Sequence, residues 1–390
     1  MDNVGQPNAD FKPSGDGWLE FRRLMPCAAK WAYFDHAAVA PISAPAQAAL
    51  ASWAKDLEEN GCADWPQWAA QLEHVRRRGA ALISASPDEL ALVHNTTEGV
   101  NLVAEGFPWR PGDNVVVPAN EFPTNLYPWM NLASRGVEVR RVPVEQGRID
   151  LAQVAAACDV RTRIVAVSWI GYASGWRSDV DALVELAHDR GALLFLDAIQ
   201  GLGVFPLDVR RTPVDFLAAD GHKWLLGPEG AGLFYLRREH LDLLRPIGLG
   251  WNSVVQSHDF DRIELAPKPA AARYEGGTYN MPGLLALGAS LELLAAYPIE
   301  QIAARILAIT DQLCERLMRA GATIASCREA EHASGIVSFE LPGRDPALLR
   351  KQCRERQVIV SCRAGRLRAS PHAYANSDDI ERLLAALSAQ

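Results

Sequence analysis

The chain has 390 residues, of which 49% are hydrophobic and 22% are charged, a composition that matches globular proteins and excludes disordered, collagen-like and coiled-coil chains. Its 39 Lys and Arg against 47 Asp and Glu leave a net charge of −8, which argues against a broad nucleic-acid-binding surface. No uncharged apolar run reaches the about 18 residues that a membrane span needs.

Residues 1–20 lack the basic head and the apolar stretch of a signal peptide. The seven cysteines are scattered and none forms a C-x-x-C pair, as in proteins of a reducing compartment. We therefore expect a cytoplasmic protein without a metal site, and without nucleic acid or membrane as a partner.

Short β-rich runs alternate with helix-like segments between residues 80 and 240, which predicts a mostly parallel sheet covered by helices on both faces. Most of the predicted strands have apolar residues at consecutive positions, as strands buried on both faces do. The predicted strands are 114–118, 137–143, 163–169, 192–197, 216–219 and 232–236. Helices are predicted over 151–158 and 180–190, the second ending before Gly191.

Residues 251–283 are rich in Pro, Gly and polar residues and predict a long irregular segment. Beyond them we expect helices over 284–296, 302–320 and 377–387 and strands over 335–341 and 357–362. The expected division is a large α/β domain over 31–260 and a small α+β domain over 261–390, with residues 1–30 packing on the small domain.

The segment with the clearest chemistry is Asp220-Gly221-His222-Lys223, which lies between two predicted strands. A lysine in a partly desolvated pocket keeps a nucleophilic amine that can form a Schiff base with an aldehyde. A solvated loop lysine fits the same position.

Asp197 ends an apolar strand upstream, and an acid there points into the crevice where α/β sheets bind ligands. A helix cap or turn explains the same aspartate. Considered with Lys223, it fits pyridoxal phosphate, whose pyridine nitrogen is kept protonated by a carboxylate while a lysine holds the aldehyde carbon.

Thr96 and Thr97 follow Asn95 at the start of an apparent helix, and Asn95 and Glu98 have the spacing of a capping box. A helix amino terminus offers free N–H groups and a dipole that favour an anion such as phosphate. Helix capping alone accounts equally well for these residues.

In this order, the Thr-Thr-Glu helix start, the Asp-x-x-Gln strand end and Gly-His-Lys resemble the class V aminotransferase family of pyridoxal-phosphate enzymes. That family includes cysteine desulfurases, selenocysteine lyases and isopenicillin N epimerases. The resemblance covers roughly residues 33–382, with further similar segments at 33–38, 121–125 and 273–278. It implies a fold-type-I transferase fold with a seven-stranded-type sheet in the large domain.

The resemblance also implies the roles of the residues around the cofactor ring. Lys223 would carry the Schiff base, Asp197 would pair with the pyridine nitrogen, and Gln200 would hydrogen-bond the 3-hydroxyl oxygen. Phe122 would stack on the ring where desulfurases use histidine, so it could not exchange protons.

The phosphate would be bound by Thr96, Thr97 and His222, together with Thr278 from a second subunit. The resemblance therefore implies a homodimer in which each site is completed across the interface.

Arginines near the carboxyl end suit an amino-acid substrate, since a guanidinium binds a carboxylate through two parallel hydrogen bonds. By position, Arg368 resembles the family's carboxylate-binding arginine. Arg363 is a second candidate, whereas Arg366 fits a solvated charge. His36 could line the substrate pocket or be an ordinary packed histidine.

Three departures bear on the reaction. Residues 364–367 lack the cysteine that forms the persulfide in desulfurases, and Cys362 lies before this loop on a predicted strand. Asp220 stands where desulfurases often use a hydroxyl residue, so it would repel the phosphate unless it is turned away or paired. Trp169 replaces a polar ring contact.

We therefore expect an aminotransferase-like or epimerase-like enzyme that moves protons at the α-carbon of an amino acid. The alternative is carbon–sulfur cleavage of the lyase or desulfurase type, which the missing loop cysteine disfavours. A more distant alternative is a binding protein that keeps the fold without turnover.

Overall fold

The larger part of the molecule is built on a seven-stranded sheet with the strand order β2-β8-β7-β6-β5-β3-β4. The computed structural model describes residues 17–388. The strands of this sheet are β2 (Leu90–Val93), β3 (Asn114–Pro118), β4 (Glu138–Val142), β5 (Thr162–Ser168), β6 (Leu193–Asp197), β7 (Phe216–Asp220) and β8 (Gly232–Leu236). Strand β8 is antiparallel to both of its neighbours, and the other neighbouring pairs are parallel. The predicted mostly parallel α/β sheet is confirmed.

Helices cover both faces of this sheet, because successive side chains of a strand point to opposite sides. On β6, Leu194 and Leu196 enter one core and Phe195 enters the other. The core around Phe195 also takes side chains from α4 and α5, and the opposite core takes side chains from α6 and α7. These helices are α4 (Thr96–Gly106), α5 (Tyr127–Asn131), α6 (Leu151–Ala157) and α7 (Val180–Asp189).

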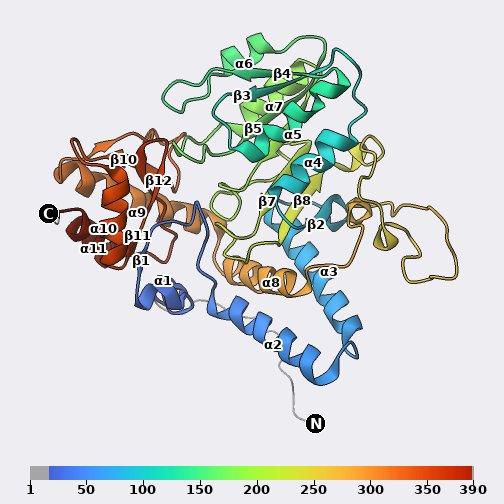
Figure 1. Cartoon of the computed structure of the whole chain (residues 1–390), viewed down its shortest axis with the longest axis horizontal. Coiled ribbons are helices and arrows are strands. Elements are labelled where there is room, and N and C mark those ends of the chain that lie inside the picture. Colours follow the sequence, from blue (N-terminus) through green and yellow to red (C-terminus); the bar gives the residue numbers. More distant parts are fainter. Residues whose placement is uncertain (1–16, 389–390) are drawn as a thin grey trace.

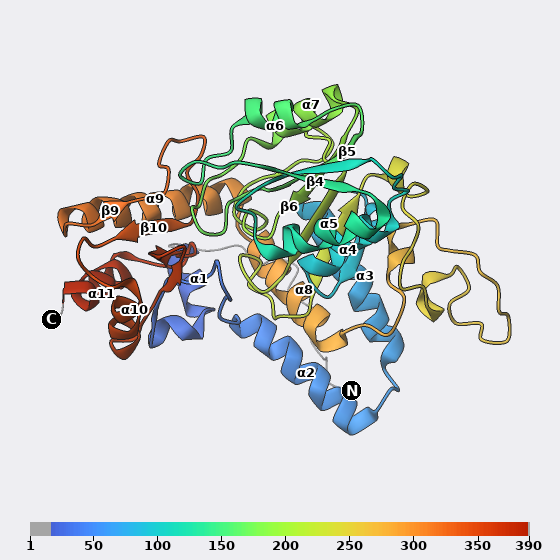
Figure 2. The same cartoon turned by 45° about the horizontal axis from the view of Figure 1, so that its top comes forward.

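Three further helices, α2 (Ala44–Asn60), α3 (Trp65–Leu82) and α8 (Met281–Ala295), pack on one another, with α8 against both α2 and α3. Figure 1 shows α8, in orange, lying between α2 and the sheet. Helices α2 and α3 and strand β2 were not among the predicted elements. Before α8, the predicted irregular segment forms a long loop, which is yellow in Figures 1 and 2 and extends away from the sheet.

The carboxyl-terminal part forms a smaller α+β unit, coloured orange to red beside the large sheet in Figure 2. Its sheet has the order β12-β13-β10-β9. The elements of this unit are α9 (Ile299–Arg319), β9 (Thr323–Ile324), β10 (Val337–Glu340), α10 (Pro346–Glu355), β11 (Val358–Ile359), β12 (Ser361–Arg363), β13 (Arg366–Ala369) and α11 (Ser377–Ser388). Within residues 17–388 no single helix is long and apolar enough to cross a membrane, and only α8 and α9 together reach that length, at a mutual angle of 83°.

The amino-terminal segment is tied to this smaller unit. Strand β1 (Ala32–Tyr33) pairs in parallel with β11, and Arg22 of helix α1 (Gly17–Arg23) forms a 2.7 Å ion pair with Asp379. Residues 1–16 of the predicted segment 1–30 lie outside the described residues. The domain limits at residues 30 and 260 stay predictions. Since α8 packs on α2 and α3, we propose that the small domain begins after this helix.

Candidate active site

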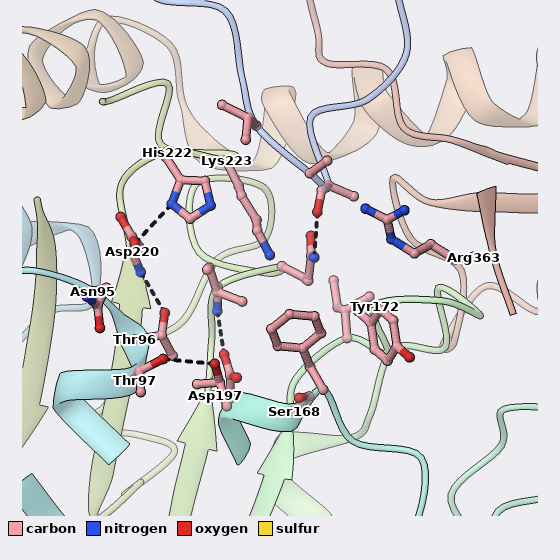
Figure 3. Close-up of a pocket in the computed structure, with 18 of the residues that line it drawn as sticks. Asn95, Thr96, Thr97, Ser168, Tyr172, Asp197, Asp220, His222, Lys223 and Arg363 are labelled. Carbon is pink, nitrogen blue, oxygen red and sulfur yellow. Dashed lines mark hydrogen bonds and ion pairs between the residues drawn. The ribbon is translucent and has the colours of Figure 1, made fainter. Parts of the chain in front are cut away.

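Most of the predicted site residues meet in one cavity of about 280 Å³ at the carboxyl ends of β5, β6 and β7. This is the edge at which parallel sheets bind ligands. Of the predicted residues, the cavity is lined by Thr96, Thr97, Phe122, Asp197, Gln200, His222, Lys223, Arg363 and Arg368. Figure 3 shows Lys223 pointing into the space between Asp197 and Arg363.

The charges of Lys223 and Asp197 act on each other across the cavity, where Asp197 is buried and Lys223 is half-buried. Asp197 is 2% exposed, and burial raises the pKa of its carboxyl to about 6, although the Ile199 N–H and the Lys223 amine oppose that shift. Burial also lowers the pKa of the Lys223 amine to about 8, against the attraction of Asp197. A lysine with this pKa is partly neutral near pH 8, the form that can attack an aldehyde.

The amino terminus of α4 forms one wall of the cavity. The side chain of Asn95 caps the helix by accepting from the Glu98 N–H at 2.9 Å, so the capping interpretation is correct. The N–H groups of Thr96 and Thr97 have no helical acceptor, as at every helix start. Capping and anion binding are therefore compatible here.

His222 and Asp220 lie opposite this helix end, as Figure 3 shows. The His222 Nδ1 atom is 3.0 Å from Asp220 Oδ2, too poorly aligned for a hydrogen bond, and Asp220 Oδ1 also has no hydrogen-bond partner within residues 17–388. The His222 imidazole beside the free N–H groups of this helix start is a donor set that fits a phosphate. One oxygen of the Asp220 carboxylate lies beside His222, and the carboxylate still lines the cavity, so it is not turned away from it.

Gln200 and Phe122 line the same cavity as Lys223 and Asp197, so a planar ring bound between the lysine and the carboxylate would contact both side chains. Gln200 is 2% exposed and donates from Nε2 to the carbonyl oxygen of Ala37 at 3.0 Å. The Lys223 Nζ atom lies 5.7 Å from the centre of the Phe122 ring. This arrangement fits the ring of pyridoxal phosphate, because it combines a lysine, a carboxylate, an amide and an aromatic face.

Two arginines from the smaller unit complete the cavity. Arg368 is 1% exposed and donates to Ser361 Oγ at 3.1 Å, to the Tyr172 carbonyl oxygen at 2.6 Å and to Asp35 Oδ1 at 3.1 Å. Three of its five N–H groups are thereby used, and two remain for a ligand. Arg363 donates to its neighbouring carbonyl oxygen at 2.7 Å and also lines the cavity.

The structure does not bring His36 or Thr278 into this cavity. His36 is fully buried beside it, with Nδ1 3.0 Å from the Ser370 carbonyl oxygen and Nε2 2.9 Å from the Tyr374 hydroxyl. Both ring nitrogens are thus engaged in the core. Thr278 is exposed on the loop before α8. That position leaves it accessible to a second subunit.

Three residues in or beside the cavity had no role assigned from the sequence; they are Glu121, Ser168 and Tyr172. Glu121 is buried and accepts from the Ser168 N–H at 2.6 Å and from the Ser168 hydroxyl. Burial, with a contribution from Asp197, raises the pKa of Glu121 to about 7. Tyr172 packs edge-on against Phe122 at 5.2 Å. Glu121 directly precedes Phe122 in the sequence. An acidic residue next to the predicted ring-stacking residue was the sequence signal from which Glu121 could have been identified.

Cys362 lies outside the lining of the cavity, and its thiol contacts the Pro346 carbonyl oxygen at 3.1 Å. Burial raises the pKa of this thiol, which disfavours the nucleophilic thiolate. Among residues 17–388, no group of three or more His, Cys, Asp or Glu is arranged to hold a metal ion.

Comparisons with known proteins agree with this geometry. The Aminotransferase class-V family model matches residues 32–383. A probable cysteine desulfurase of Methanothermobacter thermautotrophicus is 32% identical over 93% of this chain and 96% of its own. The apo structure of a cysteine desulfurase from Thermococcus onnurineus superposes with a TM-score of 0.84 at 25% identity, over 94% of this chain and 96% of its own.

A lysine-to-alanine variant of a protein named C-DES, with glycine covalently linked to its pyridoxal-phosphate cofactor, superposes with a TM-score of 0.88. It is 23% identical and covers 94% of this chain and 98% of its own, so it supports the shared fold. The chain belongs to the class V aminotransferase family, and its cofactor is pyridoxal 5′-phosphate.

Proposed function

We propose that this protein is an enzyme that moves a proton at the α-carbon of an amino acid, with Lys223 as the base, in an aminotransferase-like or epimerase-like reaction. The observation that carries the proposal is the Lys223 amine, whose pKa desolvation lowers to about 8, in a cavity that also holds Asp197 and Arg368. A base with a pKa near the working pH is the most effective for proton transfer.

When bound, pyridoxal phosphate withdraws electrons from the α-carbon of an amino acid joined to it. Asp197 supports this withdrawal by holding a proton on the pyridine nitrogen, because a carboxyl with a pKa of about 6 is mainly ionised at neutral pH. Arg368 would use its two remaining N–H groups to orient the substrate carboxylate. Lys223 then faces the α-carbon as an amine that can accept and return its proton.

Phe122, the residue predicted to stack on the cofactor ring, is not a candidate for the base. Phe122 occupies the stacking position and has no ionisable atom, so it cannot share the proton transfer with Lys223. We further propose a homodimer, because Thr278 is exposed on the loop before α8, where it could serve the site of a second subunit.

Carbon–sulfur cleavage is a second candidate, favoured by the relatives named cysteine desulfurases. It begins with the same removal of the α-proton and differs in the bond that breaks next. The described loop after Arg363 offers no thiol, and Cys362 points elsewhere, so such cleavage would release the sulfur without a persulfide on these residues.

The experiment is a screen of single amino acids against the protein loaded with pyridoxal phosphate, with analysis of keto acid, inverted amino acid and sulfide. Lys223→Ala should abolish all products and the visible absorption band that borohydride removes from the parent protein. A keto acid or inverted amino acid supports the first candidate, and sulfide supports the second. A folded parent protein that cannot take up the cofactor would refute both.

A further inference from the structure

Trp224 follows Lys223 directly, but its side chain turns away from the cavity into the core. The indole is 1% exposed and is not part of the cavity lining. Its Nε1–H donates to Gln200 Oε1 at 2.8 Å. A core residue is thus hydrogen-bonded to a side chain that does line the cavity.

This bond determines which way the amide of Gln200 faces. Its Oε1 atom accepts from Trp224, and its Nε2 atom donates to the Ala37 carbonyl oxygen at 3.0 Å. Turning the amide by 180° would place two donors together at Trp224 and two acceptors together at Ala37, so both bonds would be lost. The second N–H of Gln200 remains, and it has no other partner among residues 17–388.

The indole itself has little freedom to move. The Trp224 carbonyl oxygen lies 3.3 Å from His372 Nε2, and the indole centre lies 6.0 Å from the ring of His36. A β-carbon placed on Gly335 would lie 2.6 Å from the edge of the indole, so the backbone of the smaller unit closes that side. Three separate segments therefore hold the donor that orients Gln200.

We propose that Trp224 is a positioning residue that holds the Gln200 amide so that an N–H, and not the carbonyl oxygen, meets the ring hydroxyl oxygen of the cofactor. The inference rests on the proposed function, because it requires pyridoxal phosphate bound at Lys223. An N–H donated to that ring oxygen competes with the proton that the oxygen shares with the lysine-bound nitrogen. The bond therefore lowers the pKa of that nitrogen.

The test is Trp224→Phe, which keeps an aromatic ring and removes the N–H. The pH at which the visible absorption of the bound cofactor changes should rise by about 0.4 to 1 unit, the effect of one lost hydrogen bond. The charged groups that act on Lys223 are unchanged in this variant; they are Asp197, Arg368, Asp220 and Arg363. A shift of this midpoint therefore reports a change in the orientation of the Gln200 amide.

Two variants control for a general loosening of the core. Tyr374→Phe removes a buried hydroxyl that bonds His36 in the same aromatic cluster and does not touch Gln200, so the midpoint should stay that of the parent. Gln200→Leu should raise the midpoint as Trp224→Phe does, and the double variant should show no further rise. Additivity of the two shifts would contradict the proposed coupling.

The outcomes separate this inference from the proposed function. If Trp224→Phe retains a borohydride-sensitive absorption band with the parent midpoint, the inference is wrong and the proposed function stands. If the parent protein takes up no cofactor, the proposed function fails. Should Trp224→Phe not fold, benzothienylalanine at position 224 keeps the indole shape without the N–H and must give the same rise.

Discussion

Arg368 of β13 and Asp35, which follows β1, form an ion pair with 3.1 Å between Nη2 and Oδ1, although Arg368 is only 1% exposed. Residues 333 positions apart thus meet at the edge of the cavity. The pair joins the amino-terminal segment to the smaller unit. It neutralises the guanidinium in the absence of substrate while leaving two N–H groups available.

We predict that Arg368→Ala raises the KM for the amino acid substrate about 10-fold to 100-fold, the effect of losing charge-assisted hydrogen bonds to a carboxylate. Cofactor affinity should change little, because the residues proposed to bind the phosphate lie on other elements. Steady-state kinetics and a cofactor titration measure the two effects. Arg366→Ala is the matched control, since that residue pairs with Glu340 at the surface and should leave KM unchanged. An unaltered KM in Arg368→Ala would contradict the assigned role.

The buried carboxyl of Asp197 should make the stability of the cofactor-free protein depend on pH. Its folded pKa of about 6 lies above the ordinary 3.8, so this group favours folding at low pH and loses that contribution as the pH rises from about 4 to 7. The raised pKa corresponds to about 2 to 3 kcal/mol over this range.

Urea unfolding of the cofactor-free parent and of Asp197→Asn at pH 4 and pH 7 tests this expectation. The free energy of unfolding of the variant should gain about 2 to 3 kcal/mol relative to the parent on going to pH 7. Parallel pH profiles of the two proteins would contradict the raised pKa.

Asp220 should weaken phosphate binding, because its carboxylate faces the anion's place next to His222. Asp220→Ser removes the negative charge and supplies a hydroxyl donor, so we predict that pyridoxal phosphate binds at least about tenfold more tightly. An absorbance titration of the cofactor-free protein gives the dissociation constant. Asp220→Asn should fall between parent and serine variant, and weaker binding by a folded serine variant would show that the carboxylate supports the site through His222.

Cys362→Ala should leave turnover unchanged for every substrate that the protein accepts. The thiol contacts the Pro346 carbonyl oxygen, lies outside the cavity lining and has a pKa raised by burial. The comparison is made with cysteine as substrate, by measuring sulfide and by mass spectrometry of the protein during turnover. A persulfide on Cys362, or a large loss of activity in the variant, would make it a desulfurase nucleophile.

Local sequence patterns predicted the central strands because they contain runs of consecutive apolar residues that are buried on both faces. Strands β3 and β8 have the predicted bounds. Strand β2 was missed, since it has only four residues and is stabilised by pairing with β8, far along the chain. The predicted strand 357–362 is divided between β11 and β12, because β11 pairs with β1 and β12 pairs with β13.

Helices α2 and α3 illustrate why some local patterns are uninformative. Among the residues of α2 only Ala46 is buried, so the helix lacks a pronounced apolar stripe. Helix α3 buries Arg76, whose guanidinium forms an ion pair with the buried Glu275. A charge inside the apolar face of a helix breaks the periodic pattern, and its partner lies 199 residues away.

The sequence alone determined the family to which this protein belongs, since Lys223, Asp197 and the Thr-Thr helix start stand in short motifs whose order along the chain resembles that of the family. The tertiary structure alone decided which side chains share the cavity. It left His36 in the core, joined Arg368 to Asp35, placed Asp220 beside His222 and oriented Gln200 through Trp224. Those contacts connect distant segments, and their energies depend on burial and distance, which no local pattern encodes.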